Sequence, residues 1–178
     1  MKRRTAALAL LATAAALPGC ARYYYGDAAP VRADLVETNA KAIDTLLQRI
    51  NLDPTRPILV GTLVSIDRLA ESSRLGRTLS EQLAGQLVQR GVLVVEPRLR
   101  DNLVIEPNQG ELLLSRELHE VSQRHDAQAV LIGTYAASLR SVYVSLKLVH
   151  PVGNLVMAAA DYTLPMDDNV RMLLHARS

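Results

Sequence analysis

Residues 58–95 read ILVGTLVSIDRLAESSRLGRTLSEQLAGQLVQRGVLVV, and this stretch decides the class of fold. Its first nine residues, 58–66, are nearly all apolar and rich in β-branched side chains, which predicts a strand buried on both faces. A helix follows, because Ser72-Ser73 can cap it, its leucines recur at helical spacing, and Arg90-Gly91 can close it. Residues 92–95 predict a second strand, so the stretch as a whole predicts a β-α-β unit.

Downstream of this unit the sequence predicts antiparallel strands. Residues 129–135, AVLIGTY, predict a third buried strand. The segment 141–149 alternates, which indicates a strand with one face toward water. Its two faces carry Val142, Val144, Leu146 and Leu148 on one side and Tyr143, Ser145 and Lys147 on the other. A turn at 151–154 and a strand over 155–164 complete a hairpin.

Helices are predicted on both sides of the β-α-β unit. Apolar residues at helical spacing predict a helix over 34–50. Ser115 can cap another helix that runs to about His125, with Leu118 and Val121 inward, while 99–110 predicts a loop or a short edge strand. The expected fold class is therefore α/β (α+β): a single mixed sheet of about five strands packed with three helices, in the order α-β-α-β-α-β-β-β.

The first twenty residues carry the pattern of an exported lipoprotein. Lys2, Arg3 and Arg4 precede the uncharged, Ala- and Leu-rich stretch 5–17, which is typical of a signal peptide and shorter than a membrane span. Leu17, Pro18, Gly19 and Cys20 then resemble the bacterial lipobox, in which the cysteine thiol receives diacylglycerol and the peptide is cut before it. An ordinary signal peptide with a chance cysteine is the alternative.

These features divide the chain into a lipoprotein signal peptide (1–19), a lipidated tether (20–33), an α/β domain (34–165) and a C-terminal tail or short helix (166–178). Fully extended, the tether reaches about 40 Å. Tyr23, Tyr24 and Tyr25 in it favour a membrane–water interface, and a disordered linker is the alternative. Ala21 rather than Asp follows the cysteine, which by the enterobacterial sorting rule indicates export to the outer membrane.

Composition argues against a nucleic-acid partner and against disulfides. Loss of the three basic signal residues takes the formal charge from +2 to near −1, so the mature chain has no basic excess. Once Cys20 is acylated, no thiol remains for a disulfide, because the chain has one cysteine. With no Trp and no Phe, the core must be filled by Leu, Val, Ile and Ala.

The sequence also lacks the usual signatures of catalysis. It contains no G-x-S-x-G elbow, no Walker motif and no G-x-G-x-x-G, no pair of carboxylates stands out as a glycosidase couple, and its four histidines lack metal-site spacing. We therefore expect no enzyme, no cofactor, no metal site and no small-molecule substrate. Tyr135, Tyr143 and Tyr162 lie on successive predicted strands, as a stacking platform or as ordinary sheet packing.

The segment Arg74, Leu75, Gly76 and Arg77 at the predicted helix start is a candidate protein contact. A helical glycine costs up to ~1 kcal/mol against alanine, which favours a close approach of another part of the protein, or of a partner, to the backbone at Gly76. Packing of the helix on the sheet is one explanation. A partner flanked by the two arginines is the other.

Several segments together resemble the FlgO-domain family of outer-membrane lipoproteins: LGR at 75–77, ELLLSREL at 111–118, VLIGTY at 130–135 and VYVSLKLV at 142–149. The resemblance spans roughly Asp53 to Pro165. It implies a lipoprotein needed for a stable flagellum and motility, acting with other outer-membrane flagellar proteins and carrying no catalytic residues. The pattern is shared more loosely with secretion-channel subunits and with activators of peptidoglycan synthases.

Two functions therefore stay open. The first is a non-catalytic lipoprotein on the periplasmic face of the outer membrane, held by Cys20, that supports flagellar assembly and motility through other flagellar or envelope proteins or further copies of itself. The second is a regulatory binding module for a periplasmic cell-wall synthase or another envelope assembly. Activators of that kind often carry long tethers, whereas residues 21–33 are few.

Overall fold

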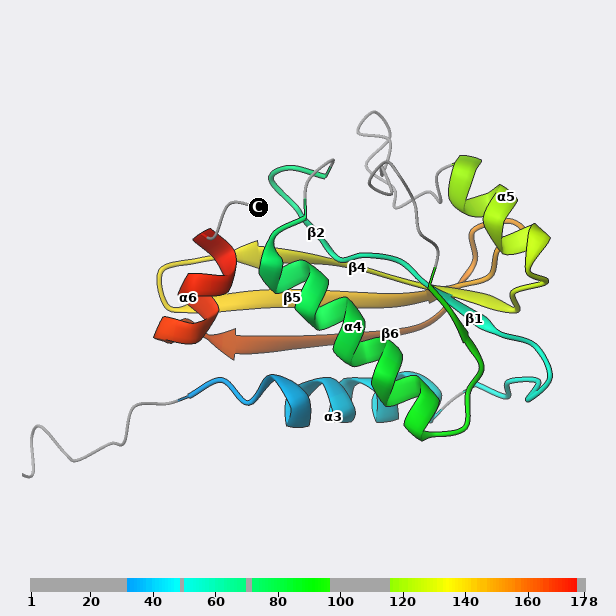
Figure 1. Cartoon of the computed structure of the whole chain (residues 1–178), viewed down its shortest axis with the longest axis horizontal. Helices are drawn as coiled ribbons and strands as arrows, with labels where there is room; N and C mark the ends of the chain where they lie inside the picture. The colour runs from blue at the N-terminus through cyan, green and yellow to red at the C-terminus, as the bar shows by residue number, and fades with distance from the viewer. Residues whose placement is uncertain (1–31, 49, 70–71, 97–115, 176–178) are drawn as a thin grey trace, which may run out of the picture. The chain divides into compact units, whose positions relative to one another are not determined.

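The computed structural model describes residues 32–48, 50–69, 72–96 and 116–175 (Figure 1). The predictions for 1–31, including the lipobox, and for 99–110 lie outside the described residues. The elements in chain order are α3 (Leu35–Leu47), β1 (Ile58–Val60), β2 (Val64–Ser65), α4 (Arg74–Gln89), β3 (Val94–Val95), α5 (Arg116–Arg124), β4 (Ala129–Ala137), β5 (Ser141–Val149), β6 (Val156–Pro165) and α6 (Asp168–His175).

A single mixed sheet joins the strands in the order β3-β1-β4-β5-β6, and β2 pairs with β4 beyond the end of β1. The pairings of β1 with β3 and β4 are parallel, as a β-α-β unit requires, and those of β5 with β4 and β6 are antiparallel. This confirms the predicted fold class. The described residues hold six strands and four helices rather than five and three, because one predicted strand is split and the tail contains a helix.

The split falls inside the predicted strand 58–66. Val60 pairs with Leu131 and Val64 with Thr134, so the first strand holds one residue more than its partner over this interval, which is a bulge. The Leu63 backbone N–H donates to Ser80 Oγ at 2.8 Å, and its carbonyl accepts from Ser72 Oγ at 2.7 Å. Because these serines satisfy the backbone, the strand can leave the ladder without an unpaired polar group.

One face of the sheet packs against α3, α4 and α6 (Figure 1). The leucine stripe of α4 is buried on it, as are the alternate residues of β5, which confirms the alternation predicted for that strand. The buried residues of the two elements are Leu75, Leu79, Leu83 and Leu87 from α4, and Val142, Val144, Leu146 and Leu148 from β5. The core is thus built from aliphatic side chains, as predicted for a chain without Trp and Phe.

The opposite face of the sheet is partly covered by α5. There Val121 packs with Leu59, Val130 and Ile132 in a second, smaller cluster, so the inward placement predicted for Val121 is confirmed. On the same face Tyr143 is 55% exposed. Tyr135 and Tyr162 lie on the other face, which packs against α3, α4 and α6, so the three tyrosines form no common stacking platform.

The C-terminal segment docks on the domain as α6. Its Val170 is fully buried, and α6 contacts α4 across one end of the sheet. Two predicted elements are shorter than expected: the helix over 34–50 spans Leu35–Leu47, and the strand over 92–95 pairs only through Val94–Val95.

Candidate functional site

The start of α4 is fixed to the sheet by a small hydrogen-bond network. Ser73 is the N-cap, and its Oγ accepts from the Gly76 N–H at 3.2 Å. The Tyr135 hydroxyl donates to the same Oγ at 2.8 Å and accepts from the Ser73 N–H at 3.1 Å. Tyr135 comes from β4 and is only 4% exposed, so a buried tyrosine sets the position of the helix start.

Gly76 lies directly against the bulge between β1 and β2. A Cβ atom at this position would stand 2.4 Å from the Leu63 carbonyl oxygen, 2.6 Å from Ser72 Oγ and 3.0 Å from Tyr135 Cε1. Contacts this short do not occur between a real Cβ and its neighbours, so only glycine fits. The close backbone approach predicted at Gly76 is therefore an approach to the protein's own sheet.

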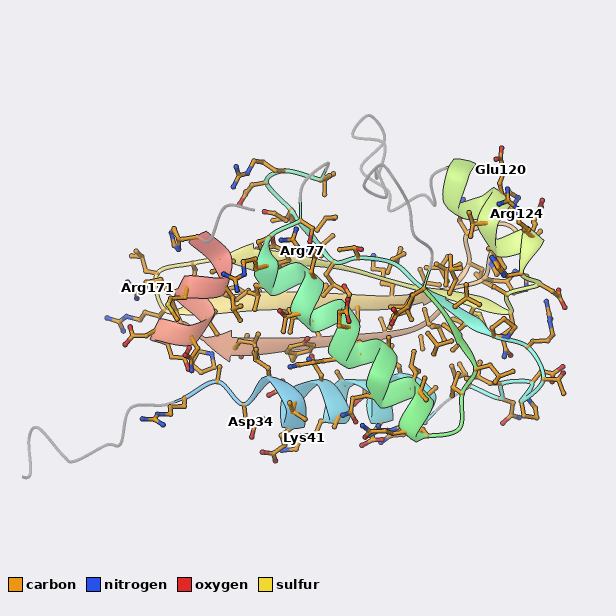
Figure 2. The ribbon with its side chains drawn as sticks, viewed as in Figure 1. Asp34, Lys41, Arg77, Glu120, Arg124 and Arg171 are labelled. Atoms are coloured by element: carbon orange, nitrogen blue, oxygen red, sulfur yellow. The ribbon has the colours of Figure 1, made fainter. Side chains whose placement is uncertain are left out.

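The predicted contact segment is divided by this geometry. Leu75 is fully buried and Gly76 is buried, whereas Arg74 and Arg77 are exposed. Figure 2 shows Arg77 at the start of α4, and its guanidinium donates to the Ser72 carbonyl at 3.3 Å. A partner at this segment can reach only the two arginines, and such a contact stays a prediction.

A second connection joins the first described residues to the last helix. Asp167 Oδ1 accepts from the Val170 N–H at 2.8 Å and caps α6, while Oδ2 accepts from the Ala33 N–H at 2.9 Å. Burial raises the pKa of Asp167, but these backbone donors, with Asn169 and the nearby Arg32, outweigh it and hold the pKa below its usual value. One carboxylate thus ties Ala33, which lies just before α3, to the start of α6.

Replacing Asp167 with alanine should lower the free energy of unfolding at neutral pH by about 1 kcal/mol, the usual cost of losing an N-cap. Because the folded pKa is depressed, this stabilisation is present above the ordinary Asp pKa and lost as pH falls through the folded value. Urea unfolding at pH 7 and pH 3 measures this contribution. The difference in the free energy of unfolding between wild type and Asp167→Ala should be smaller at pH 3 than at pH 7. Asp161→Ala, at an exposed position of β6, is the control, and an equal gap at both pH values would contradict the prediction.

A buried polar network crosses three elements at the centre of the helix layer. Asn39 of α3 is fully buried, donates to Gln82 Oε1 of α4 at 2.8 Å and accepts from the Tyr162 hydroxyl of β6 at 2.6 Å. Burial raises the pKa of Tyr162, which stays protonated. Among the described residues no buried side-chain polar atom lacks a partner, so this network holds the fold together and offers no free group to a ligand.

The same two helices are joined at their far ends by Arg90. Its Nε donates to Asp44 Oδ1 at 2.6 Å, and its other nitrogens reach the carbonyl oxygens of Gln86 and Ala40. The hydrogen bond from Arg90 lowers the pKa of the Asp44 carboxyl. The residue that the sequence predicts as a helix end therefore also clamps α4 to α3.

Three described histidines, His119, His150 and His175, have a ring nitrogen within hydrogen-bond distance of a backbone carbonyl oxygen. His119 Nδ1 lies 2.7 Å from the Pro151 carbonyl oxygen, linking α5 to the turn between β5 and β6. Within the described ranges no three His, Cys, Asp or Glu side chains gather as a metal site would require. The helices described there are also too short or too polar to span a bilayer.

Comparison of the sequence with known protein families shows which family this chain belongs to. The family model for FlgO protein matches residues 40–169, from within α3 to the start of α6, and includes every described strand. The chain belongs to the FlgO family. This confirms the resemblance carried by LGR, ELLLSREL, VLIGTY and VYVSLKLV. No sequence among the curated proteins matches this FlgO-family chain.

Solved structures share the fold of this FlgO-family chain. The LpoB C-terminal domain from Salmonella enterica matches with a TM-score of 0.54 at 14% identity, over 74% of this chain and 98% of that one. The same domain from Escherichia coli gives 0.53 at 12% identity over the same shares. The NMR structure of E. coli LpoB gives 0.50 at 12% identity, over 79% of this chain and 74% of that one. At such identities the likeness is one of fold.

Proposed function

We propose that this FlgO-family chain is a non-catalytic lipoprotein, anchored by lipid on Cys20 to the periplasmic face of the outer membrane, that supports flagellar assembly and motility. The family match over 40–169 carries the proposal, and the lipobox at 17–20 supports it independently. The role is mechanical: the anchor holds the domain at the membrane, and its surface binds other outer-membrane flagellar or envelope proteins or further copies of itself.

The anchor has a simple energetic basis. Each buried CH₂ group contributes roughly 0.8 kcal/mol, and a single acyl chain holds a protein only marginally. A diacylglycerol together with an acylated amine on Cys20 makes membrane residence effectively permanent. The tether of residues 20–33 then keeps the attachment point at Ala33 within about 40 Å of the bilayer.

The second candidate is a regulatory module for a periplasmic cell-wall synthase or another envelope assembly. It is favoured by the shared fold with LpoB and by the looser sequence resemblance to activators of peptidoglycan synthases. The short tether favours the flagellar role, because a synthase must be reached away from the membrane. Direct binding of the purified chain to a purified synthase, with swimming unaffected by deletion, would favour the second candidate.

Swimming in soft agar tests the proposal, with filaments counted by electron microscopy. A deletion strain should stop swimming, wild type should restore it, and Cys20→Ser should not, because the chain without lipid has lost its permanent attachment to the outer membrane. Ala21→Ser is the matched control, since it changes the neighbouring residue and keeps the lipobox. Normal swimming of the deletion strain would refute the flagellar role, and normal swimming with Cys20→Ser would refute the need for the anchor.

A further inference from the structure

One end of the domain brings together parts that are remote in sequence. The Asp167 carboxylate binds the Ala33 N–H, where the tether meets the domain. The Met166 N–H donates to the Arg140 carbonyl at 2.9 Å, which brings the turn between β4 and β5 to the start of α6. In Figure 1 this turn, α6 and the start of α3 lie at the same end of the sheet. We call this the tether end and define it as residues 32–34, 74–77, 138–140 and 167–172.

The tether end is basic. Its charged residues, all among those described, are five arginines and three aspartates: Arg32, Arg74, Arg77, Arg140 and Arg171, with Asp34, Asp167 and Asp168. All five arginines are exposed. Two of the aspartates are occupied as helix caps, because Asp34 accepts from the Glu37 N–H and Asp167 from the Val170 N–H.

The opposite end has the reverse balance of charge. Of its described residues in 53–56, 119–126 and 150–155, Asp53, Glu120 and Asp126 are acidic and Arg56 and Arg124 are basic. Arg56 is bound to Asp126 by a bidentate pair, with distances of 2.8 and 3.1 Å. Figure 2 shows where some of these side chains lie, with Arg77 and Arg171 toward the tether end and Glu120 and Arg124 of α5 toward the opposite end.

Apolar side chains accompany the arginines. Leu139, at the tip of the β4–β5 turn, is 94% exposed, and Met172 of α6 is 68% exposed. Leu155 and Val152 are similarly exposed at the opposite end. Exposure alone therefore does not distinguish the two ends, but basic charge and the attached tether do.

We propose that the tether end rests on an anionic phospholipid surface, an inference that depends on the proposed lipid on Cys20 for its membrane. Two observations select this occupant. The residues between Cys20 and the described domain join it at this end, so an anchor on Cys20 is attached here and not at the α5 end. Its arginines are opposite in charge to anionic headgroups, and each should strengthen binding to the membrane about fivefold. The exposed Leu139 can enter the membrane–water interface.

This contact orients the domain. With the tether end on the membrane, α5 and the β5–β6 turn face away from it, and their acidic surface is presented to the periplasm. Partners would then meet the domain at that distal end and along its sides.

Vesicle sedimentation tests the contact without the anchor. The complete mature chain, residues 20–178 with Cys20→Ser, is mixed with vesicles of phosphatidylethanolamine containing a quarter phosphatidylglycerol, or with phosphatidylcholine vesicles. We expect binding only to the first, weakened as sodium chloride rises from about 50 to about 300 mM. Arg171→Gln should weaken it about fivefold, whereas Arg124→Gln, a matched change on α5, should leave it unchanged.

A second matched pair of variants tests whether an apolar side chain enters the membrane interface. Leu139→Ala should weaken binding and Leu155→Ala should not, and thermal unfolding confirms that each variant is folded. Equal effects of Arg171→Gln and Arg124→Gln, or binding that ignores phosphatidylglycerol, would overturn the proposal. Because no lipid is attached in this assay, its failure leaves the lipid anchor and the flagellar role untouched, and those are judged by membrane fractionation and swimming.

Discussion

Replacing Gly76 with alanine should lower the free energy of unfolding by about 3 kcal/mol, although alanine is the better helix former. The new methyl group would stand 2.4 Å from the Leu63 carbonyl oxygen, a backbone atom that cannot rotate away. Relief requires α4 to move off the bulge, which would break the hydrogen bonds that Ser72 and Ser80 make to Leu63. Overpacking of this kind commonly costs 1–3 kcal/mol, and a backbone clash places it at the high end.

Gly85 supplies the control within the same helix. It is exposed, and a Cβ there would meet nothing within 4 Å. Gly85→Ala should therefore raise the free energy of unfolding by about 0.5–1 kcal/mol through helix propensity alone. Chemical unfolding of both variants measures the difference, and a Gly76→Ala variant as stable as wild type would refute the packing explanation for LGR.

The second large effect is expected at the buried network of Asn39. Asn39→Ala should cost about 2–3 kcal/mol, because the buried Tyr162 hydroxyl loses its acceptor and Gln82 loses its donor. Tyr162→Phe should cost less, about 1–2 kcal/mol, since it removes the hydroxyl and leaves one acceptor unsatisfied.

A double-mutant cycle separates this network from simple packing. In the Asn39→Ala, Tyr162→Phe double variant the two losses should fall short of additivity by about 1–2 kcal/mol. Thr45→Ala, an exposed change in α3, should stay within about 0.5 kcal/mol of wild type. Additive losses would show that the hydrogen bond between the two side chains carries no stability of its own.

Local patterns predicted most of the fold. Leu79, Leu83 and Leu87 recur at helical spacing, and Val144 and Leu146 alternate along β5, so burial followed from periodicity. The bulge could not be predicted, because the apolar run 58–66 reads as one strand and the break depends on Ser72 and Ser80 reaching Leu63. For residues 166–178 the sequence predicts only a tail or a short helix, because the stability of α6 comes from docking Val170 on the core.

The candidate sites divide in the same way. Gly76 can be picked out from the sequence, because a glycine in a helix is less stable than alanine there and indicates a close contact with the backbone. Asn39 lies among the apolar positions of the predicted helix over 34–50, but its partner Tyr162, like Ala33 that binds Asp167, lies far away in the sequence and could not be predicted. The lipobox at 17–20 stays a prediction, made from a short linear motif whose recognition requires no tertiary structure.

The position of β4 has a consequence for how the chain reaches its native state. On one side β4 pairs with β5 through a short turn, whereas on the other Ile58 of β1 pairs with Ala129 across the whole of α4 and α5. Nearby contacts close with little loss of chain entropy and remote ones with more, so we expect the β4-β5-β6 meander to nucleate assembly. The parallel pairings of β1 with β3 and β4, and the hydrogen bond from Ala33 to Asp167, should form late in folding. Until then β1 and β3 remain unpaired. Residues 58–66, which pair across this long separation, would then stay exposed until late in folding.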